Sequence, residues 1–167
     1  ESLYKAYEKV GNNYRAAETL ELLNELYPNV HNYNQISVLY NNAGYDEKAL
    51  EFAEKAYQHN KNATTAFNYA HGLKHKDKAK FKEILEESLR LDPNKPHSLY
   101  ELGRLLKREN NPEGKKMIQQ AFDTWKRKFD TNQMSESDYS WLSSAADELG
   151  MRDFAQQVRE SEPQFKG

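Results

Sequence analysis

The sequence predicts an all-α fold made of helical hairpins, because one short motif recurs along it at nearly constant spacing. Gly11 and Gly44 are 33 residues apart, and Ala16 and Ala49 are also 33 residues apart. A period of this size is typical of stacked helical hairpins and not of a single globular core. About five such hairpins fit the 167 residues of the chain.

The motif places large residues in a helical stripe, then a turn residue, then a small residue. Its copies are Leu3-Tyr4-x-x-Tyr7-x-x-x-Gly11, Ile36-Ser37-x-x-Tyr40-x-x-x-Gly44, Leu102-Gly103-x-x-Leu106-x-x-x-Asn110 and Leu142-Ser143-x-x-Ala146-x-x-x-Gly150. The small residues that follow are Ala16, Ala49, Gly114 and Ala155. A small side chain at this position predicts that the two helices of a hairpin approach closely there.

The first two hairpins are expected at residues 1–29 and 30–63. The second begins with large residues three and four apart, at Tyr33, Ile36 and Tyr40. This spacing makes one stripe of a helix. Gly44 is expected to end that helix, because glycine adopts the left-handed conformation that a helix terminus often needs. Asp46 is expected to cap the next helix by accepting hydrogen bonds from its first N–H groups.

The other three hairpins are expected at residues 64–95, 96–129 and 135–162. The third hairpin lacks a turn glycine and carries a basic stretch from Lys74 to Lys80 instead. A linker at residues 130–136 precedes the last hairpin, which Ser135 and Asp138 are expected to open as a capping box.

The composition favours a folded chain without thiol chemistry. Hydrophobic residues make up 37% and charged residues 30%, but 11 tyrosines, 7 phenylalanines and 2 tryptophans argue against disorder. The absence of cysteine excludes disulfides, thiolate metal sites and a cysteine nucleophile. No apolar run has the roughly 18 to 20 residues that a membrane span needs. The chain starts without methionine and inside a repeat, so we read it as a fragment of a longer protein whose compartment stays open.

The net charge of −2 is unevenly distributed along the chain. Residues 1–70 carry a charge of −3, residues 71–128 carry +6 and residues 129–167 carry −5. A basic middle favours an acidic partner, and one interpretation is a surface centred on residues 74–128 that binds phosphate or nucleic acid. The other interpretation is a solvated lysine-rich surface. The mildly acidic total charge argues against nucleic acid.

Motifs of known chemistry are missing from the sequence. It contains no phosphate-binding glycine loop, dinucleotide fingerprint, nucleophile elbow or helical zinc motif. His71 and His75 have the i, i+4 spacing of two metal ligands on one helix face, but no third ligand is apparent and the adjacent Lys74 and Lys76 oppose a cation. The sequence therefore predicts no catalytic residue, no metal site and no cofactor, and the chain is not expected to be an enzyme.

The recurring motif resembles that of the tetratricopeptide repeat (TPR) family, in which W-x2-L-G-x2-Y is followed by Gly, Ala, a bulky residue, Ala and Pro. The second hairpin matches it best, with Tyr33, Ile36, Ser37, Tyr40, Gly44, Ala49, Ala53 and Ala56. It departs from the pattern at Lys61, where the closing proline would fall. The resemblance covers nearly the whole chain. It implies a single repeat domain with the form of a right-handed α-solenoid, or superhelix.

The resemblance also implies that the first helix of each hairpin lines a concave groove that holds a partner peptide. The residues expected to face this groove are His31, Asn34, Asn41, Asn42, Asn68, His75, Tyr100, Arg104 and Lys107. Asn34 and Asn68 hold equivalent places in successive repeats, and each amide has a donor and an acceptor for a peptide backbone. Arg104 and Lys107 are candidates for holding a carboxylate or phosphate of the peptide. The alternative is that the two asparagines only solvate the groove.

The predicted function is a non-catalytic protein–protein interaction module that binds a partner peptide or segment. The alternative is an accessory domain that recruits a substrate or partner for a larger enzyme or chaperone. Some TPR proteins clamp the acidic tail of heat-shock chaperones with Lys, Asn and Arg. The corresponding positions hold Asn34 with Val38, Thr65 with Tyr69, and His97 with Glu101, which argues against that role. The partner's identity and the oligomeric state stay open.

Overall fold

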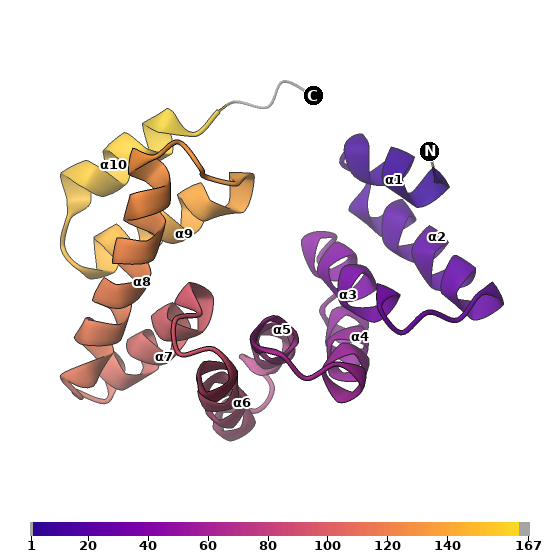
Figure 1. Cartoon of the computed structure of the whole chain (residues 1–167), viewed down its shortest axis with the longest axis horizontal. Helices are drawn as coiled ribbons and strands as arrows, with labels where there is room; N and C mark the ends of the chain where they lie inside the picture. The colour runs from indigo at the N-terminus through magenta and orange to yellow at the C-terminus, as the bar shows by residue number, and fades with distance from the viewer. Residues whose placement is uncertain (1, 164–167) are drawn as a thin grey trace. The chain divides into compact units, whose positions relative to one another are not determined.

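The chain folds into paired α-helices. The computed structural model describes residues 2–163, and over this range it contains ten α-helices and no β-strand. The helices are α1 (Leu3–Lys9), α2 (Asn13–Leu26), α3 (Asn32–Asn42), α4 (Asp46–His59), α5 (Ala63–Leu73), α6 (Lys78–Leu91), α7 (Pro96–Arg108), α8 (Glu113–Asp130), α9 (Glu136–Glu148) and α10 (Arg152–Ser161). Each odd-numbered helix packs against the even-numbered helix that follows it, which makes five hairpins (Figure 1). The predicted all-α fold of about five hairpins is confirmed.

The hairpins belong to two compact units. Unit 1 contains α1 to α6 and ends at Leu91, and unit 2 contains α7 to α10 and begins at Asp92. That the whole chain forms one repeat domain stays a prediction.

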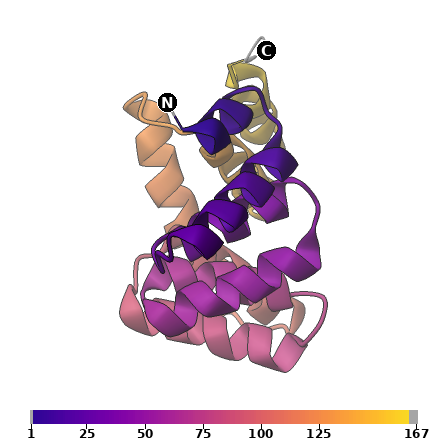
Figure 2. The same cartoon turned by 90° about the vertical axis from the view of Figure 1, so that its right-hand side faces the viewer.

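Unit 1 is held together by contacts between successive hairpins as well as within them. Helix α2 packs against α3 and helix α4 packs against α5, a succession that Figure 2 shows from indigo to purple. A buried core of hairpins 1 and 2 consists of Ala16, Ala17, Leu20, Ile36, Leu39, Tyr40, Ala49 and Phe52. The predicted close approach at Ala49 is present, because the Ser37 hydroxyl of α3 donates a buried hydrogen bond of 2.8 Å to the Ala49 carbonyl of α4.

Left-handed residues make most of the turns within hairpins. Gly11, Gly44 and Gly150 have φ angles of 74°, 79° and 80°, and Asn110 takes this role in the turn between α7 and α8 with a φ of 57°. The turn between α5 and α6, residues 74–77, contains no residue with positive φ. The third hairpin, which lacks a turn glycine in its sequence, thus makes its turn without a left-handed residue.

Two local expectations about caps have opposite outcomes. The Ser135 N–H donates to Asp138 Oδ2 at 2.9 Å, as the predicted capping box requires. Asp46 does not cap α4, because Tyr45 holds the cap position and Asp46 is already the first helical residue. Its negative charge in the first turn still stabilises α4 by a favourable interaction with the helix dipole.

Unit 2 contains a very close approach between two helices. Gly103 of α7 and Gly114 of α8 face each other, and a Cβ added at Gly114 would lie 2.5 Å from the Gly103 carbonyl oxygen and 2.5 Å from the Lys107 nitrogen. Only hydrogen fits at this position. Further along α8, the indole of Trp125 is fully buried, as expected for the core stripe of this helix.

Candidate binding surface

Two asparagines join the first helices of hairpins 2 and 3. Asn68 Nδ2 of α5 donates a hydrogen bond of 2.8 Å to Asn34 Oδ1 of α3. Both side chains are half-buried. The bond uses one donor of Asn68 and one acceptor site of Asn34, so the Asn34 NH₂ group and the Asn68 carbonyl keep capacity for further hydrogen bonds.

A hollow opens beside this amide pair, and we call it the α3–α5 hollow. Its inner part has a volume of about 40 Å³ and its outer part about 260 Å³. The two parts share Asn41, Ala49, His71 and Gly72 in their linings, so they lie next to each other. The full lining is Ser37, Val38, Asn41, Asp46, Ala49, Asn68, His71, Gly72, Lys74, His75 and Lys76.

Gly72 shapes one side of the hollow. Helix α5 approaches α4 so closely at this residue that an added Cβ would lie 2.9 Å from Leu50 Cδ1 and 3.3 Å from Leu50 Cα. A side chain at this position would therefore push α5 and α4 apart. The glycine was not among the residues expected in the site, because its sequence context marks no turn and shows nothing of α4.

The hollow is more basic than acidic. Lys74, His75 and Lys76 come from the α5–α6 turn, and Asp46 is the carboxylate among the lining residues. Lys76 Nζ lies 3.8 Å from Glu47 Oε1, but the Glu47 side chain is 94% exposed. An ion pair of that length and exposure is screened by water and neutralises little of the lysine charge.

His71 and His75 do not share a helix face. Helix α5 ends at Leu73, so His71 lies on the helix and His75 lies in the following turn. The side chains of both residues nevertheless line the outer part of the hollow. Within residues 2–163, no group of three or more His, Cys, Asp or Glu side chains is arranged to hold a metal ion.

Two of the unit 1 residues expected in the groove, His31 and Asn42, lie away from the hollow. His31 is exposed before the start of α3, where its backbone N–H donates to Asn29 Oδ1 at 3.1 Å. Asn42 lines a separate open depression between the turns of hairpins 1 and 2, together with Gly11 and Tyr14. The structure thus places Asn41, Asn68 and His75 around the hollow and joins Asn34 to Asn68 by a hydrogen bond. His31 and Asn42 lie outside this cluster, and the predicted roles of all these residues stay untested.

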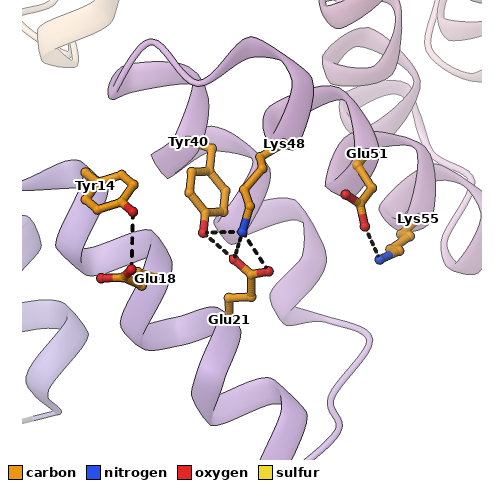
Figure 3. Close-up of polar contacts among 7 residues, drawn as sticks. All are labelled: Tyr14, Glu18, Glu21, Tyr40, Lys48, Glu51 and Lys55. Atoms are coloured by element: carbon orange, nitrogen blue, oxygen red, sulfur yellow. Dashed lines mark hydrogen bonds and ion pairs between the residues drawn. The ribbon is translucent and has the colours of Figure 1, made fainter.

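A polar network fixes α3 to the helices on either side of it in the sequence. The Tyr40 hydroxyl of α3 donates to the Glu21 carboxylate of α2, and Lys48 Nζ of α4 lies 2.8 Å and 3.0 Å from the two Glu21 oxygens (Figure 3). Burial and the hydrogen bond to Glu21 raise the pKa of Tyr40 to about 12. The phenol therefore stays a neutral donor at physiological pH, and α3 has a fixed position beside the hollow.

The three predicted site residues of unit 2 make contacts within that unit. Tyr100 is buried, with its ring 5.6 Å from Trp141 and 6.2 Å from Trp125 between centroids. Arg104 Nε lies 3.0 Å from Glu148 Oε1, and Lys107 Nζ lies 2.9 Å from Glu148 Oε2 and 2.8 Å from the Glu148 carbonyl.

The carboxylate of Glu148 thus occupies the place that the sequence suggested for an acid of the partner. Burial alone would raise the pKa of Glu148, but the hydrogen bonds and charges of Lys107 and Arg104 outweigh it and lower that pKa. Glu148 is therefore ionised at neutral pH and neutralises part of the positive charge on this face. A role of Arg104 and Lys107 in partner binding stays a prediction.

Comparison with known proteins supports the fold. No protein-family model and no curated protein matches the sequence. Among solved structures, MamA is similar over 96% of this chain and 92% of its own, with a TM-score of 0.65 and 15% identity. The chain has the fold of a TPR array.

Two further solved structures show the same TPR-type fold. MamA of Desulfovibrio magneticus RS-1, from residue 41 to its end, is similar over 99% of this chain and 94% of its own, with a TM-score of 0.55 and 14% identity. A tetratricopeptide repeat protein from Parabacteroides merdae ATCC 43184 is similar over 94% of this chain and 75% of its own, with a TM-score of 0.60 and 14% identity. The predicted all-α solenoid of TPR type is confirmed as the fold. None of the helices that the structure describes is long and apolar enough to cross a membrane.

Proposed function

We propose that this chain is a non-catalytic protein-interaction module and that an extended segment of its partner lies along α3 and α5 of unit 1. The TPR-type fold supports the class of function, because arrays of hairpins present helix faces to other molecules. The polar α3–α5 hollow supports the location of the binding surface on α3 and α5. Its lining comes from two successive hairpins, so a segment that crosses both would contact it.

The observation that carries the proposal is the hydrogen bond between Asn68 and Asn34. Each amide is held in one orientation by the other, so neither has to be ordered when a partner binds. Preorganised groups of this kind lose less conformational entropy on binding. The Asn34 donor and the Asn68 acceptor together match the alternating C=O and N–H groups of an extended backbone.

The length of the surface suits a peptide of several residues. Asn34 and Asn41 are two turns apart on α3, roughly 10 Å at 1.5 Å per residue. An extended chain covers this distance with about three residues, at 3.3 Å per residue. The partner segment is therefore expected to reach from the amide pair to the outer part of the hollow.

The test begins with a random peptide-display library selected on the wild-type chain. The dissociation constant of a selected peptide is then measured for the double variant Asn34→Ala/Asn68→Ala. We expect roughly a tenfold loss of affinity, because two hydrogen bonds of about 1 kcal/mol or less each are removed.

The matched control is Asn13→Ala/Asn94→Ala, which removes two asparagine amides that do not line the hollow. This control is expected to keep the wild-type affinity, and circular dichroism should show unchanged helix content for both variants. Equal affinity in the wild type and in Asn34→Ala/Asn68→Ala would contradict the proposal, and so would a library that yields no binding peptide.

A further inference from the structure

The open depression between the turns of hairpins 1 and 2 is a second candidate site, and we call it the turn depression. Its volume is about 400 Å³, within the range of about 300–1,000 Å³ that is usual for small-ligand sites. Both hairpins contribute to its lining, which consists of Val10, Gly11, Asn12, Asn13, Tyr14, Asn42 and Ala43. None of these residues lines the α3–α5 hollow, so the two sites are separate.

Three asparagine side chains line the turn depression. Asn12 caps α2, Asn13 is the first residue of α2, and Asn42 is the last residue of α3. Asn12 Oδ1 accepts a hydrogen bond of 3.1 Å from the Arg15 N–H, which leaves both donors of its NH₂ group for a ligand. Among residues 2–163, no group hydrogen-bonds the side-chain amides of Asn13 or Asn42. The turn depression therefore offers both donors and acceptors.

Apolar and aromatic surface lies next to these amides. Val10 lines the turn depression and is 75% exposed. The Tyr14 ring also lines it, and the Tyr14 hydroxyl donates to Glu18 Oε1 at 3.2 Å, which holds the ring in place (Figure 3). Tyr45 packs beside Tyr14, with ring centroids 4.6 Å apart, and is 48% exposed. A ligand in the turn depression can thus contact an aromatic ring as well as amides.

The surroundings of the turn depression are electrically balanced. Within the described chain, none of the lining residues has a charged side chain. On α2, Arg15 and Glu18 neutralise each other, since Arg15 Nη1 lies 2.8 Å from Glu18 Oε2. Lys9 precedes Val10 in the sequence and Asp46 follows Tyr45, and these two residues have opposite charges. The turn depression therefore favours a neutral ligand over an anion or a cation.

A neutral sugar has both features that this lining can bind. Each hydroxyl group of a sugar is a donor and an acceptor, so neighbouring hydroxyls pair with the C=O and NH₂ groups of one amide. The C–H groups of the sugar ring form an apolar face that packs on an aromatic side chain. An extended peptide needs polar groups in a row along a helix, whereas these asparagines gather around one compact depression.

We propose that the turn depression binds a neutral sugar. Asn12, Asn13 and Asn42 hold its hydroxyl groups, and Tyr45 contacts its ring. This site does not depend on the proposed peptide path along α3 and α5, because the two use different residues. Failure of either proposal leaves the other standing.

The first experiment titrates the ¹⁵N-labelled chain with the methyl glycosides of glucose, galactose and mannose and follows amide resonances by NMR. We expect at least one sugar to shift Gly11, Ala43 and the side-chain amides of Asn13 and Asn42. Asn13→Ala/Asn42→Ala should weaken binding of that sugar by roughly tenfold, because two hydrogen-bonding amides are removed. Tyr45→Leu should weaken it by about twofold to fivefold, because the aromatic face is lost.

The matched control is Asn34→Ala/Asn68→Ala, which removes two amides outside the turn depression and should bind the sugar as the wild type does. The wild-type titration needs no variant to fold, and absence of shifts in the lining with all three sugars would overturn the proposal. Equal weakening in the control and in Asn13→Ala/Asn42→Ala would also overturn it. Wild-type affinity in Tyr45→Leu would overturn the sugar assignment, because the aromatic contact distinguishes a sugar from other neutral polar ligands.

The second experiment compares the sugar with two other ligands. Methyl glucuronide adds a carboxylate to the sugar ring, and N-acetylglycine N-methylamide presents peptide groups without a sugar. Tighter binding of the neutral glycoside than of both supports the proposal. Equal or tighter binding of the glucuronide overturns the assignment of a neutral ligand, and equal or tighter binding of the peptide analogue overturns the assignment of a sugar.

Discussion

Equivalent helix faces are open in unit 1 and covered by side chains in unit 2. Seven residues separate Asn34 from Asn41 in α3, and the same spacing separates Tyr100 from Lys107 in α7. In α3 both positions carry amides: Asn41 lines the open hollow, and Asn34 is hydrogen-bonded to Asn68, which lines it too. In α7 the tyrosine is buried against Trp141 and the lysine is paired with Glu148.

The difference lies in what the next hairpin contributes. Helix α9 supplies an indole and a carboxylate that occupy the face of α7, whereas α5 supplies one amide to α3 and otherwise leaves the face accessible. A face of a repeat is thus open or closed according to the residues of its neighbour.

The largest expected effect comes from the close glycine pair of unit 2. Gly114→Ala would place a Cβ 2.5 Å from backbone atoms of α7, where no side chain can move aside. We expect a destabilisation of about 3 kcal/mol, at the upper end for overpacked positions. Denaturant unfolding followed by tryptophan fluorescence measures it, because both tryptophans of the chain lie in unit 2.

Lys115→Ala is the control for this change, since Lys115 is the exposed neighbour of Gly114 in α8. It should leave the unfolding midpoint nearly unchanged. A Gly114→Ala protein with the wild-type midpoint would show that α7 and α8 have room to separate. The fourth hairpin would then tolerate alanine at this position, as the second hairpin does at Ala49.

The second prediction concerns two histidines at equivalent positions, His31 in unit 1 and His97 in unit 2, each three residues before the compared face. His97 packs 5.3 Å from Trp125 between ring centroids, and burial together with the charge of Lys95 lowers its pKa to about 4. Between pH 6.5 and 4 the unfolded chain takes up a proton that the folded chain refuses, so stability falls as the pH falls. Acidification from pH 7 to 5 should cost about 1–2 kcal/mol through this group.

Replacing His97 with phenylalanine keeps a ring in the cluster and removes the proton site. Unfolding free energies of the His97→Phe protein at pH 7 and pH 5 should differ by less than those of the wild type. His31→Phe, at the exposed equivalent position, should retain the wild-type difference. If both variants behave alike, His97 is not the origin of the pH dependence.

The smallest expected effect tests whether unit 2 can be opened. Glu148→Gln removes the carboxylate that Arg104 and Lys107 share, at a cost of about 1 kcal/mol for a partly exposed ion pair. The freed cations are then expected to bind inorganic phosphate, visible as NMR shifts at Arg104 and Lys107. Glu136→Gln, an exposed change on the same helix, should produce no such shifts. If phosphate causes no shifts at Arg104 and Lys107 in Glu148→Gln either, the ion pairs with Glu148 are not what closes this face.

Sequence reasoning predicted the hairpins well because their signals are local. The helical stripe around Tyr40, the left-handed Gly44 and the small Ala49 lie within one repeat, and each constrains the chain near itself. The cap at Asp46 was wrong by one position, since cap and first-turn residues favour similar side chains.

The candidate site was predictable only in part because its contacts join distant segments. Nothing near Arg104 in the sequence indicates Glu148, which comes from a different hairpin. The equivalence of Asn34 and Asn68 was visible from the repeat period, but their mutual hydrogen bond depends on how closely α5 approaches α3. The hollow itself follows from the position of Gly72 against Leu50, a contact between helices that no local pattern reveals.

The turn between α5 and α6 has a consequence for the adaptability of this protein. Because residues 74–77 include no positive φ, none of the four positions requires glycine or asparagine, and many side chains fit there without backbone strain. The turn borders the hollow, while packed helices hold the rest of the wall. Substitutions at residues 74–76, which line the hollow, can therefore change which ligand it prefers at little cost to folding. Asp77 is different, because it accepts a hydrogen bond from the Lys80 N–H and caps α6. Residues 74–76 are thus a natural place both for divergence between relatives and for the design of altered specificity.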